Sequence, residues 1–227
     1  GVSAGSIVAA AFASGAAAEE IGRAGASMKF ADVARWRPGR MGLLRSECME
    51  RFLKGLLKCR RFEEMTIPLG VVATDLMTGQ PVEFRDSGDV CLPIRASCSY
   101  PGLFQPVDDG GRLLVDGAMS VEVPAALVRA LGATHVVAVD LPMPPAVKPR
   151  NAFQVVNRCF QILQSRAGQS WERLADVVIS PEMQGVRWDA FHNAAYLVEA
   201  GERAAEEALP AIRALAKSRT SDELIPG

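Results

Sequence analysis

The chain has 227 residues, of which 49% are hydrophobic and 22% charged, which is typical of one globular domain whose core needs no metal or disulfide support. Its formal net charge of −1 excludes a general electrostatic attraction to nucleic acid or to anionic membranes. The five cysteines are odd in number and widely separated, so we expect reduced thiols and no structural zinc site. Reduced thiols indicate a cytoplasmic location, with at most peripheral contact to a membrane.

Hydrophobic patterning predicts helices that alternate with strands along most of the chain. Helices are expected at 6–20, 93–99, 124–131, 151–171 and 190–217, with two more between 28 and 65 that separate at Pro38-Gly39. Strands are expected at 67–74, 81–85, 112–115, 134–139 and 176–181. This alternation favours an α/β domain with a mostly parallel sheet.

The first five residues form a G-x-S-x-G pentapeptide, Gly1-Val2-Ser3-Ala4-Gly5. In a nucleophile elbow, this motif places the serine on a sharp strand-to-helix turn, and glycines flank it because a Cβ atom would clash with the turn. An Ala-rich helix is predicted directly after Gly5, as an elbow requires. The pattern arises by chance about one time in ten in a chain of this size, so a glycine-rich loop that caps a helix is the alternative.

A serine hydroxyl needs a base to remove its proton, and the chain offers only His135 and His192 as histidines. His135 opens a predicted buried strand, which favours a packing role. Ser3, Asp140 and His192 follow the Ser-Asp-His order of α/β-hydrolases. However, His192 falls at the start of a predicted helix, where an exposed or capping role is favoured.

A carboxylate is the other candidate base. Asp116-Gly117 follows a short predicted strand, at the position where catalytic side chains gather in α/β folds. A carboxyl group has an ordinary pKa of about 3.9 and is a weak base, but burial that raised this pKa would let Asp116 serve Ser3 directly. Asp-Gly is also a common turn dipeptide, so this pair alone is weak evidence.

Four stretches in a fixed order carry a family pattern: 1–6 (GVSAGS), 72–79 (VATDLMTG), 94–107 (IRASCSYPGLFQPV) and 114–118 (LVDGA), the last followed by Val123-Pro124. Together they span the first two thirds of the chain. In these stretches the sequence resembles the patatin-like phospholipase family, particularly its bacterial members.

The resemblance implies a three-layer α/β/α sandwich with a mostly parallel central sheet and a Ser–Asp dyad in place of a triad. Ser3 matches the nucleophile and Asp116 the general base, with Gly1, Gly5 and Gly117 as motif glycines. The activity implied is hydrolysis of lipid acyl esters through an acyl-enzyme, of the phospholipase A or lysophospholipase kind. The implied partner is a lipid or acyl ester, met in transient contact with a membrane surface, with no cofactor, metal or nucleic acid.

Two features depart from the family pattern. Ala118 stands where members commonly have glycine, which we expect to matter little. The family's glycine-rich oxyanion loop lies upstream of the serine, so residues 1–227 are expected to form a single catalytic domain that lacks its first strand and this loop. The Ala4 backbone N–H remains as a partial oxyanion donor, whereas Gly110-Gly111 lies in a polar turn and is no substitute.

The sequence leaves two other functions open. One is a Ser-His-Asp esterase or thioesterase of the α/β-hydrolase type. The other is a catalytically incomplete or non-enzymatic member, because the loss of one oxyanion donor typically costs about a hundredfold in turnover. Arg40 and Arg95 are candidates to meet a phosphate head group, although a solvated or ion-paired role is favoured for each.

Overall fold

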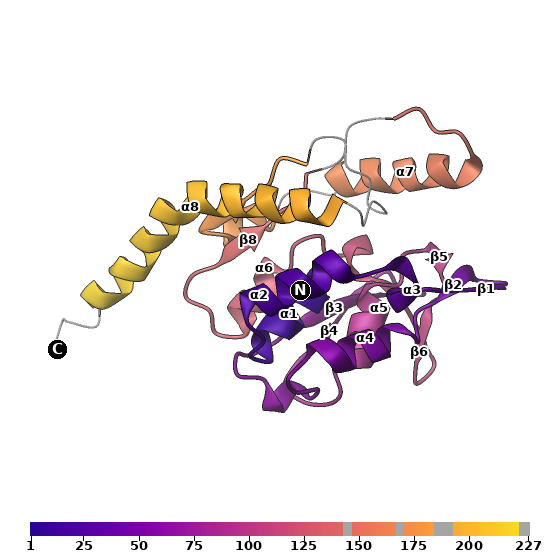
Figure 1. Cartoon of the computed structure of the whole chain (residues 1–227), viewed down its shortest axis with the longest axis horizontal. Coiled ribbons are helices and arrows are strands. Elements are labelled where there is room, and N and C mark those ends of the chain that lie inside the picture. Colours follow the sequence, from indigo (N-terminus) through magenta and orange to yellow (C-terminus); the bar gives the residue numbers. More distant parts are fainter. Residues whose placement is uncertain (143–146, 167–169, 184–192, 223–227) are drawn as a thin grey trace.

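The computed structural model describes residues 1–142, 147–166, 170–183 and 193–222 (Figure 1). The helices are α1 (Ala4–Ala13), α2 (Ala18–Ser27), α3 (Phe30–Val33), α4 (Met49–Leu56), α5 (Cys91–Ser97), α6 (Ala125–Ala130), α7 (Ala152–Arg166) and α8 (Ala194–Asp222), with short 3-10 turns η1 (Phe62–Glu64), η2 (Gly117–Met119) and η3 (Glu172–Leu174). The strands are β1 (Arg35–Gly39), β2 (Gly42–Arg45), β3 (Val71–Asp75), β4 (Pro81–Phe84), β5 (Gly102–Phe104), β6 (Val107–Asp109), β7 (Arg112–Asp116), β8 (Val137–Val139) and β9 (Val177–Ile179).

The described strands form three small sheets. The largest has the order β4-β3-β7-β6, and a single parallel bridge from Val2 to Val72 joins the chain before Ser3 to it. The second sheet has the order β1-β2-β5 at one side of the molecule, and the third pairs β8 with β9. The protein is therefore an α/β fold with mixed sheets.

The expected mostly parallel sheet is not what the structure shows, because the three strand pairings of the largest sheet are all antiparallel. Short connections explain two of these pairings, β3 with β4 and β6 with β7. The turn between β3 and β4 contains Gly79, and Gly110 and Gly111 join β6 to β7; all three glycines have positive φ. Connections this tight can only make hairpins, since a parallel pair needs a long crossover. Parallel pairing is found between β2 and β5 and between β8 and β9.

The main hydrophobic core lies between the largest sheet and the helices α1, α4 and α5. Ile94 of α5, Val71 of β3 and Leu53 of α4 are completely buried within it. The helix α5 packs on β3 and β7, and α1 packs on α5. This packing fixes the start of α1, and with it Ser3, against the carboxyl end of β7.

Two of the regions predicted to be helical are organised differently in the structure. The helix expected at 6–20 is split into α1 and α2, because Gly15 adopts a φ of 92° and Thr66 satisfies the free carbonyl of Ala13. The region 28–65 was expected to hold two helices separated at Pro38-Gly39, but these two residues end β1, and the hairpin β1–β2 lies between α3 and α4.

Candidate active site

Ser3 occupies a sharp turn between an extended segment and a helix. Its φ of 50° and ψ of −134° lie in a region that non-glycine residues rarely adopt. The preceding Val2 bridges to Val72 of β3, and α1 begins at Ala4. The strained serine and the helix of a nucleophile elbow are present, and a single bridging residue stands in the place of the preceding strand.

The glycines around this turn are not equally constrained. A Cβ atom on Gly1 would lie 2.5 Å from the Gly5 oxygen, and one on Gly117 would lie 2.2 Å from the Val72 oxygen. Only glycine fits at these two positions. The expectation that Gly5 is also required by a clash is wrong, because a Cβ atom there would have no neighbour within 4 Å.

The structure brings Ser3 and Asp116 into direct contact, although 113 positions separate them along the chain. The Ser3 hydroxyl donates a hydrogen bond of 2.7 Å to Oδ2 of Asp116, and the Ala118 N–H donates one of 2.9 Å to Oδ1. The Asp116 residue is only 2% exposed. Burial raises the pKa of its carboxyl from 3.8 to about 6, while the hydrogen bonds from Ala118 and Ser3 oppose the rise.

Further buried polar residues hold the pair in place. The hydroxyl of Ser97 accepts a 2.8 Å hydrogen bond from the Ser3 N–H, and Thr74 Oγ1 donates one of 2.9 Å to the Asp116 carbonyl. The Asp116 N–H donates to the Ser99 carbonyl at 3.0 Å. Sequence reasoning did not assign these three roles. The signal was nonetheless available, because each residue lies within a stretch that carries the family resemblance.

A pocket of about 350 Å³ opens beside the Ser3–Asp116 pair. Most of its walls are apolar, and they come from the first third of the chain, from the segment 98–104 and from α7. The lining residues are Ser3, Ala4, Ile7, Met28, Phe30, Val33, Met49, Cys98, Tyr100, Leu103, Phe104, Asp116, Phe153, Asn157, Gln161 and Gln164.

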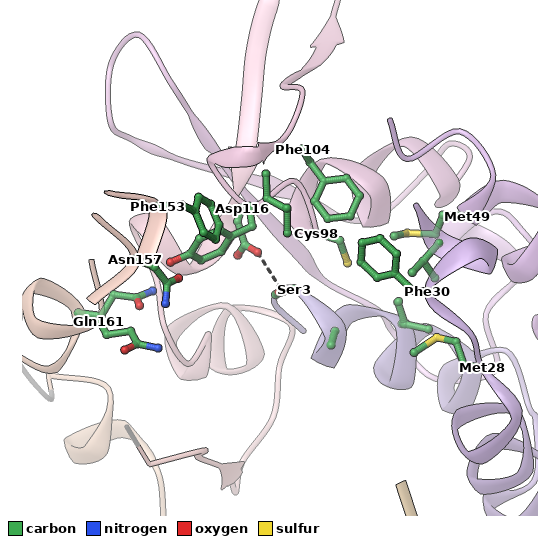
Figure 2. A pocket seen from close by; sticks show the side chains of 16 residues that line it. Ser3, Met28, Phe30, Met49, Cys98, Phe104, Asp116, Phe153, Asn157 and Gln161 are labelled. Atoms are coloured by element: carbon green, nitrogen blue, oxygen red, sulfur yellow. Dashed lines mark hydrogen bonds between the residues drawn. The ribbon is translucent and has the colours of Figure 1, made fainter. Parts of the chain in front are cut away.

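The two ends of the pocket differ in chemistry. Figure 2 shows Met28, Phe30 and Met49 gathered on one side of Ser3, and Asn157 and Gln161 of α7 on the other. The pocket can therefore hold an apolar chain at one end and a polar group at the other, with the Ser3 hydroxyl between them.

The helix α7 is fastened over the site by two contacts. Gln164 Nε2 donates a 3.0 Å hydrogen bond to the Ala118 carbonyl, next to Asp116. The Phe160 ring meets Tyr100 edge to face, with 6.4 Å between ring centroids. The sequence predicted this helix but gave no indication that its amide side chains reach the site.

The remaining predicted residues fall in different places. Arg95 is ion-paired with Glu50 at 2.7 Å, as the sequence favoured, and Arg40 is exposed on the turn after β1. Neither Asp140 nor His135 lines the pocket that holds Ser3, and His192 lies outside the described residues.

Ala4 is the first residue of α1, and no hydrogen bond from its N–H is found within the described ranges. This leaves that N–H available as an oxyanion donor.

The described part of the chain has neither a metal-binding grouping nor a helix that could span a membrane. No three His, Cys, Asp or Glu side chains of this part are grouped so that they could hold a metal ion. None of its helices combines the length and the apolar character needed to cross a bilayer.

The fold and the site thus define an α/β protein that presents a hydrogen-bonded Ser–Asp pair on a strand–helix turn beside an apolar pocket. Comparison with known proteins identifies the class more closely. Residues 1–129 match the family model described as patatin-like phospholipase. The chain belongs to this family.

Three relatives illustrate the similarity. An uncharacterized NTE family protein of Mycobacterium tuberculosis is 35% identical over 100 residues, which cover 44% of this chain and 28% of the relative. A second such protein of the same organism is 28% identical over 195 residues, which cover 74% of this chain and 33% of the relative. A lysophospholipase, NTE1, of Mycosarcoma maydis is 28% identical over 137 residues, which cover 59% of this chain and 7% of the relative. The chain therefore spans a third or less of the length of these relatives.

Proposed function

We propose that the protein hydrolyses acyl esters of lipids, with Ser3 as the nucleophile and Asp116 as the general base. The observation that carries this proposal is the 2.7 Å hydrogen bond from the Ser3 hydroxyl to the buried Asp116 carboxylate, made on an elbow at the wall of an apolar pocket. Family membership supports the class of substrate, because the matching family is described as one of phospholipases.

In the first half of the reaction, Asp116 accepts the proton of Ser3 while Oγ attacks the ester carbonyl carbon. The carbonyl oxygen becomes an oxyanion, and the donor that we assign to it is the Ala4 N–H at the start of α1. When the tetrahedral intermediate collapses, the C–O bond to the alcohol breaks. Asp116 returns its proton to the alcohol, and the acyl group stays on Ser3.

In the second half, water replaces the alcohol. Asp116 accepts a proton from the water molecule, whose oxygen attacks the acyl carbon. Collapse of this second intermediate releases the fatty acid and restores the Ser3 hydroxyl with the proton held by Asp116. The raised pKa of about 6 suits both halves, because the carboxyl is mostly ionised at neutral pH yet more basic than an ordinary aspartate.

The pocket supports a lipid of the phospholipase A or lysophospholipase type. Its apolar end, which contains Met28, Phe30 and Met49, suits the acyl chain. Its amide-lined end, with Asn157 and Gln161, suits the polar alcohol side of the ester. The relative from Mycosarcoma maydis that bears the name lysophospholipase is in agreement with this assignment.

The test uses the full-length protein with a soluble short-chain aryl ester. Ser3→Ala and Asp116→Asn should each lose activity by about a thousandfold or more, since a nucleophile or its base is removed. Asp140→Asn and His192→Ala are the matched controls and should keep it. A fluorophosphonate probe should label the wild type and not Ser3→Ala.

Two results would contradict the proposal. Retained activity in Asp116→Asn, together with loss in His192→Ala, would replace the dyad by a conventional triad. Failure of the probe to label the folded wild-type protein at Ser3 would assign the chain to a non-enzymatic role.

A further inference from the structure

The hairpin formed by β1 and β2, residues 35–45, presents apolar side chains to solvent. Trp36 is 68% exposed, Met41 57% and Leu43 38%. Every residue of β1 is exposed. In Figure 1 this hairpin projects at one edge of the molecule, beyond α3 and α4 and opposite to the end of α8. An apolar and aromatic surface of this kind on a protruding hairpin is suited to docking.

The same hairpin concentrates positive charge. It carries Arg35, Arg37, Arg40 and Arg45 and no acidic residue, although the whole chain has a formal charge of −1. Arg45 pairs with Glu47 at 3.2 Å. Among the described residues, the other three arginines make no ion pair. Because exposed charges are screened beyond about 10 Å in salt solution, a nearby surface would respond to these arginines rather than to the net charge.

The base of the hairpin is held firmly. β2 pairs in parallel with β5, and Gln105 Nε2 donates a 3.0 Å hydrogen bond to the Arg37 carbonyl. A Cβ atom on Gly42 would lie 2.6 Å from the backbone of Phe104, so the two strands approach as closely as glycine allows. The hairpin is thus fastened to β5, while Trp36, Arg40 and Met41 stay exposed.

The hairpin is also joined to the active-site pocket. Val33, just before β1, and Met49, just after β2, both line the pocket. Phe104, which pairs with Leu44 of β2, lines it as well. A surface that bound the hairpin would therefore lie beside the apolar end of the pocket.

We propose that hairpin 35–45 docks the protein on an anionic lipid surface. Trp36 and Met41 enter the interfacial layer, where tryptophan is favoured because its ring is apolar and its N–H polar. Arg35, Arg37 and Arg40 pair with the phosphates of anionic head groups, which attract basic segments next to a membrane. This inference goes beyond the hydrolysis proposed above, since docking needs neither Ser3 nor Asp116.

The experiment is a vesicle flotation assay with full-length protein that carries Ser3→Ala, so that hydrolysis cannot alter the lipid. Vesicles of phosphatidylcholine alone are compared with vesicles that also contain phosphatidylglycerol. The protein should bind the anionic vesicles and lose most of this binding at high salt. Arg37→Gln with Arg40→Gln should weaken the binding roughly tenfold or more, as expected for two interfacial arginines. Trp36→Ala should also lose binding and keep the salt dependence of what remains.

Arg213→Gln and Met77→Ser alter exposed residues outside the hairpin and are the matched controls, which should bind as the parent does. All variants are compared by thermal unfolding, so that a folding defect is recognised. When the hairpin variants are made in protein that keeps the wild-type Ser3, they should hydrolyse a soluble short-chain ester at the wild-type rate. This measurement separates a docking defect from a catalytic one.

Three results would overturn the docking proposal. The first is equal binding to neutral and anionic vesicles. The second is equal binding of hairpin and control variants. The third is a change from dimer to monomer in the hairpin variants without vesicles, which would assign the surface to a second copy of the chain.

Discussion

The Ser97 hydroxyl accepts a 2.8 Å hydrogen bond from the backbone N–H of Ser3. This contact ties the strained elbow to the last residue of α5, which packs on the strand that carries Asp116. It also means that the Ser3 N–H is already used, so it is not directed at an oxyanion. The Ala4 N–H is therefore the donor that this part of the elbow can offer.

Removal of the Ser97 hydroxyl tests this relationship. In Ser97→Ala the partly buried Ser3 N–H loses its acceptor, so we expect a loss of about 1 kcal/mol in the free energy of unfolding. We also expect a lower kcat, because the strained φ of Ser3 loses a restraint. Ser14→Ala is the matched control, since Ser14 is a buried serine at the far end of α1 whose hydroxyl also accepts a backbone N–H. It should lower stability similarly and leave kcat unchanged; equal kcat in both variants would contradict a positioning role for Ser97.

The activity should depend on pH through Asp116. Burial raises the pKa of this carboxyl to about 6, and only its ionised form can accept the Ser3 proton. The value of kcat/KM for a soluble ester should therefore fall about tenfold per pH unit below pH 6 and level off above it. The profile should be measured between pH 4.5 and 8 in a range where unfolding is excluded by circular dichroism. A profile that stays level down to pH 4.5 would mean that the Asp116 pKa is not raised in the working enzyme.

The sign of the accompanying stability effect is opposite to that of an ordinary ion-paired carboxylate. Because the folded-state pKa lies above the usual 3.8, the protonated form is favoured by folding. This contribution to stability is fully present below about pH 3.8 and is lost as the pH rises through about 6. Burial of this carboxyl therefore begins to cost stability above about pH 3.8, and the cost is complete near pH 6, where the base becomes ionised and active.

Two glycine substitutions should give opposite results. In Gly117→Ala the new methyl group would lie 2.2 Å from the Val72 backbone oxygen, so the largest sheet must shift and we expect a loss of about 2 kcal/mol or more. Gly5→Ala meets open space inside α1 and should stabilise the protein by up to about 1 kcal/mol. Thermal unfolding of the two variants measures the difference, and equal destabilisation would show that the space beside Gly5 is filled in the working protein.

The sequence predicted the parts of the site that depend on local motifs. The elbow at Ser3 and the turn at Asp116-Gly117 each follow from a few adjacent residues, and the family resemblance paired them. The hairpin 35–45 was misassigned, because Arg and Trp have no clear period there and the pairing of β2 with β5 is a long-range contact. The amides of α7 were missed for a similar reason, since helical periodicity shows one apolar face but not what that face covers.

The direction of the acyl chain in the pocket can be tested by blocking its apolar end. Met28 is half-buried there, together with Phe30 and Met49, so Met28→Trp should shorten the space available to a chain. We expect kcat/KM for long-chain aryl esters to fall about tenfold, while short-chain esters react as before, because a blocked pocket excludes only the distal methylenes. Met77→Trp, at an exposed position outside the pocket, is the control and should change neither. Gln161→Trp blocks the amide-lined end instead; if it, rather than Met28→Trp, removed the long-chain activity, the acyl chain would have to lie along α7 and the polar group at the methionine end.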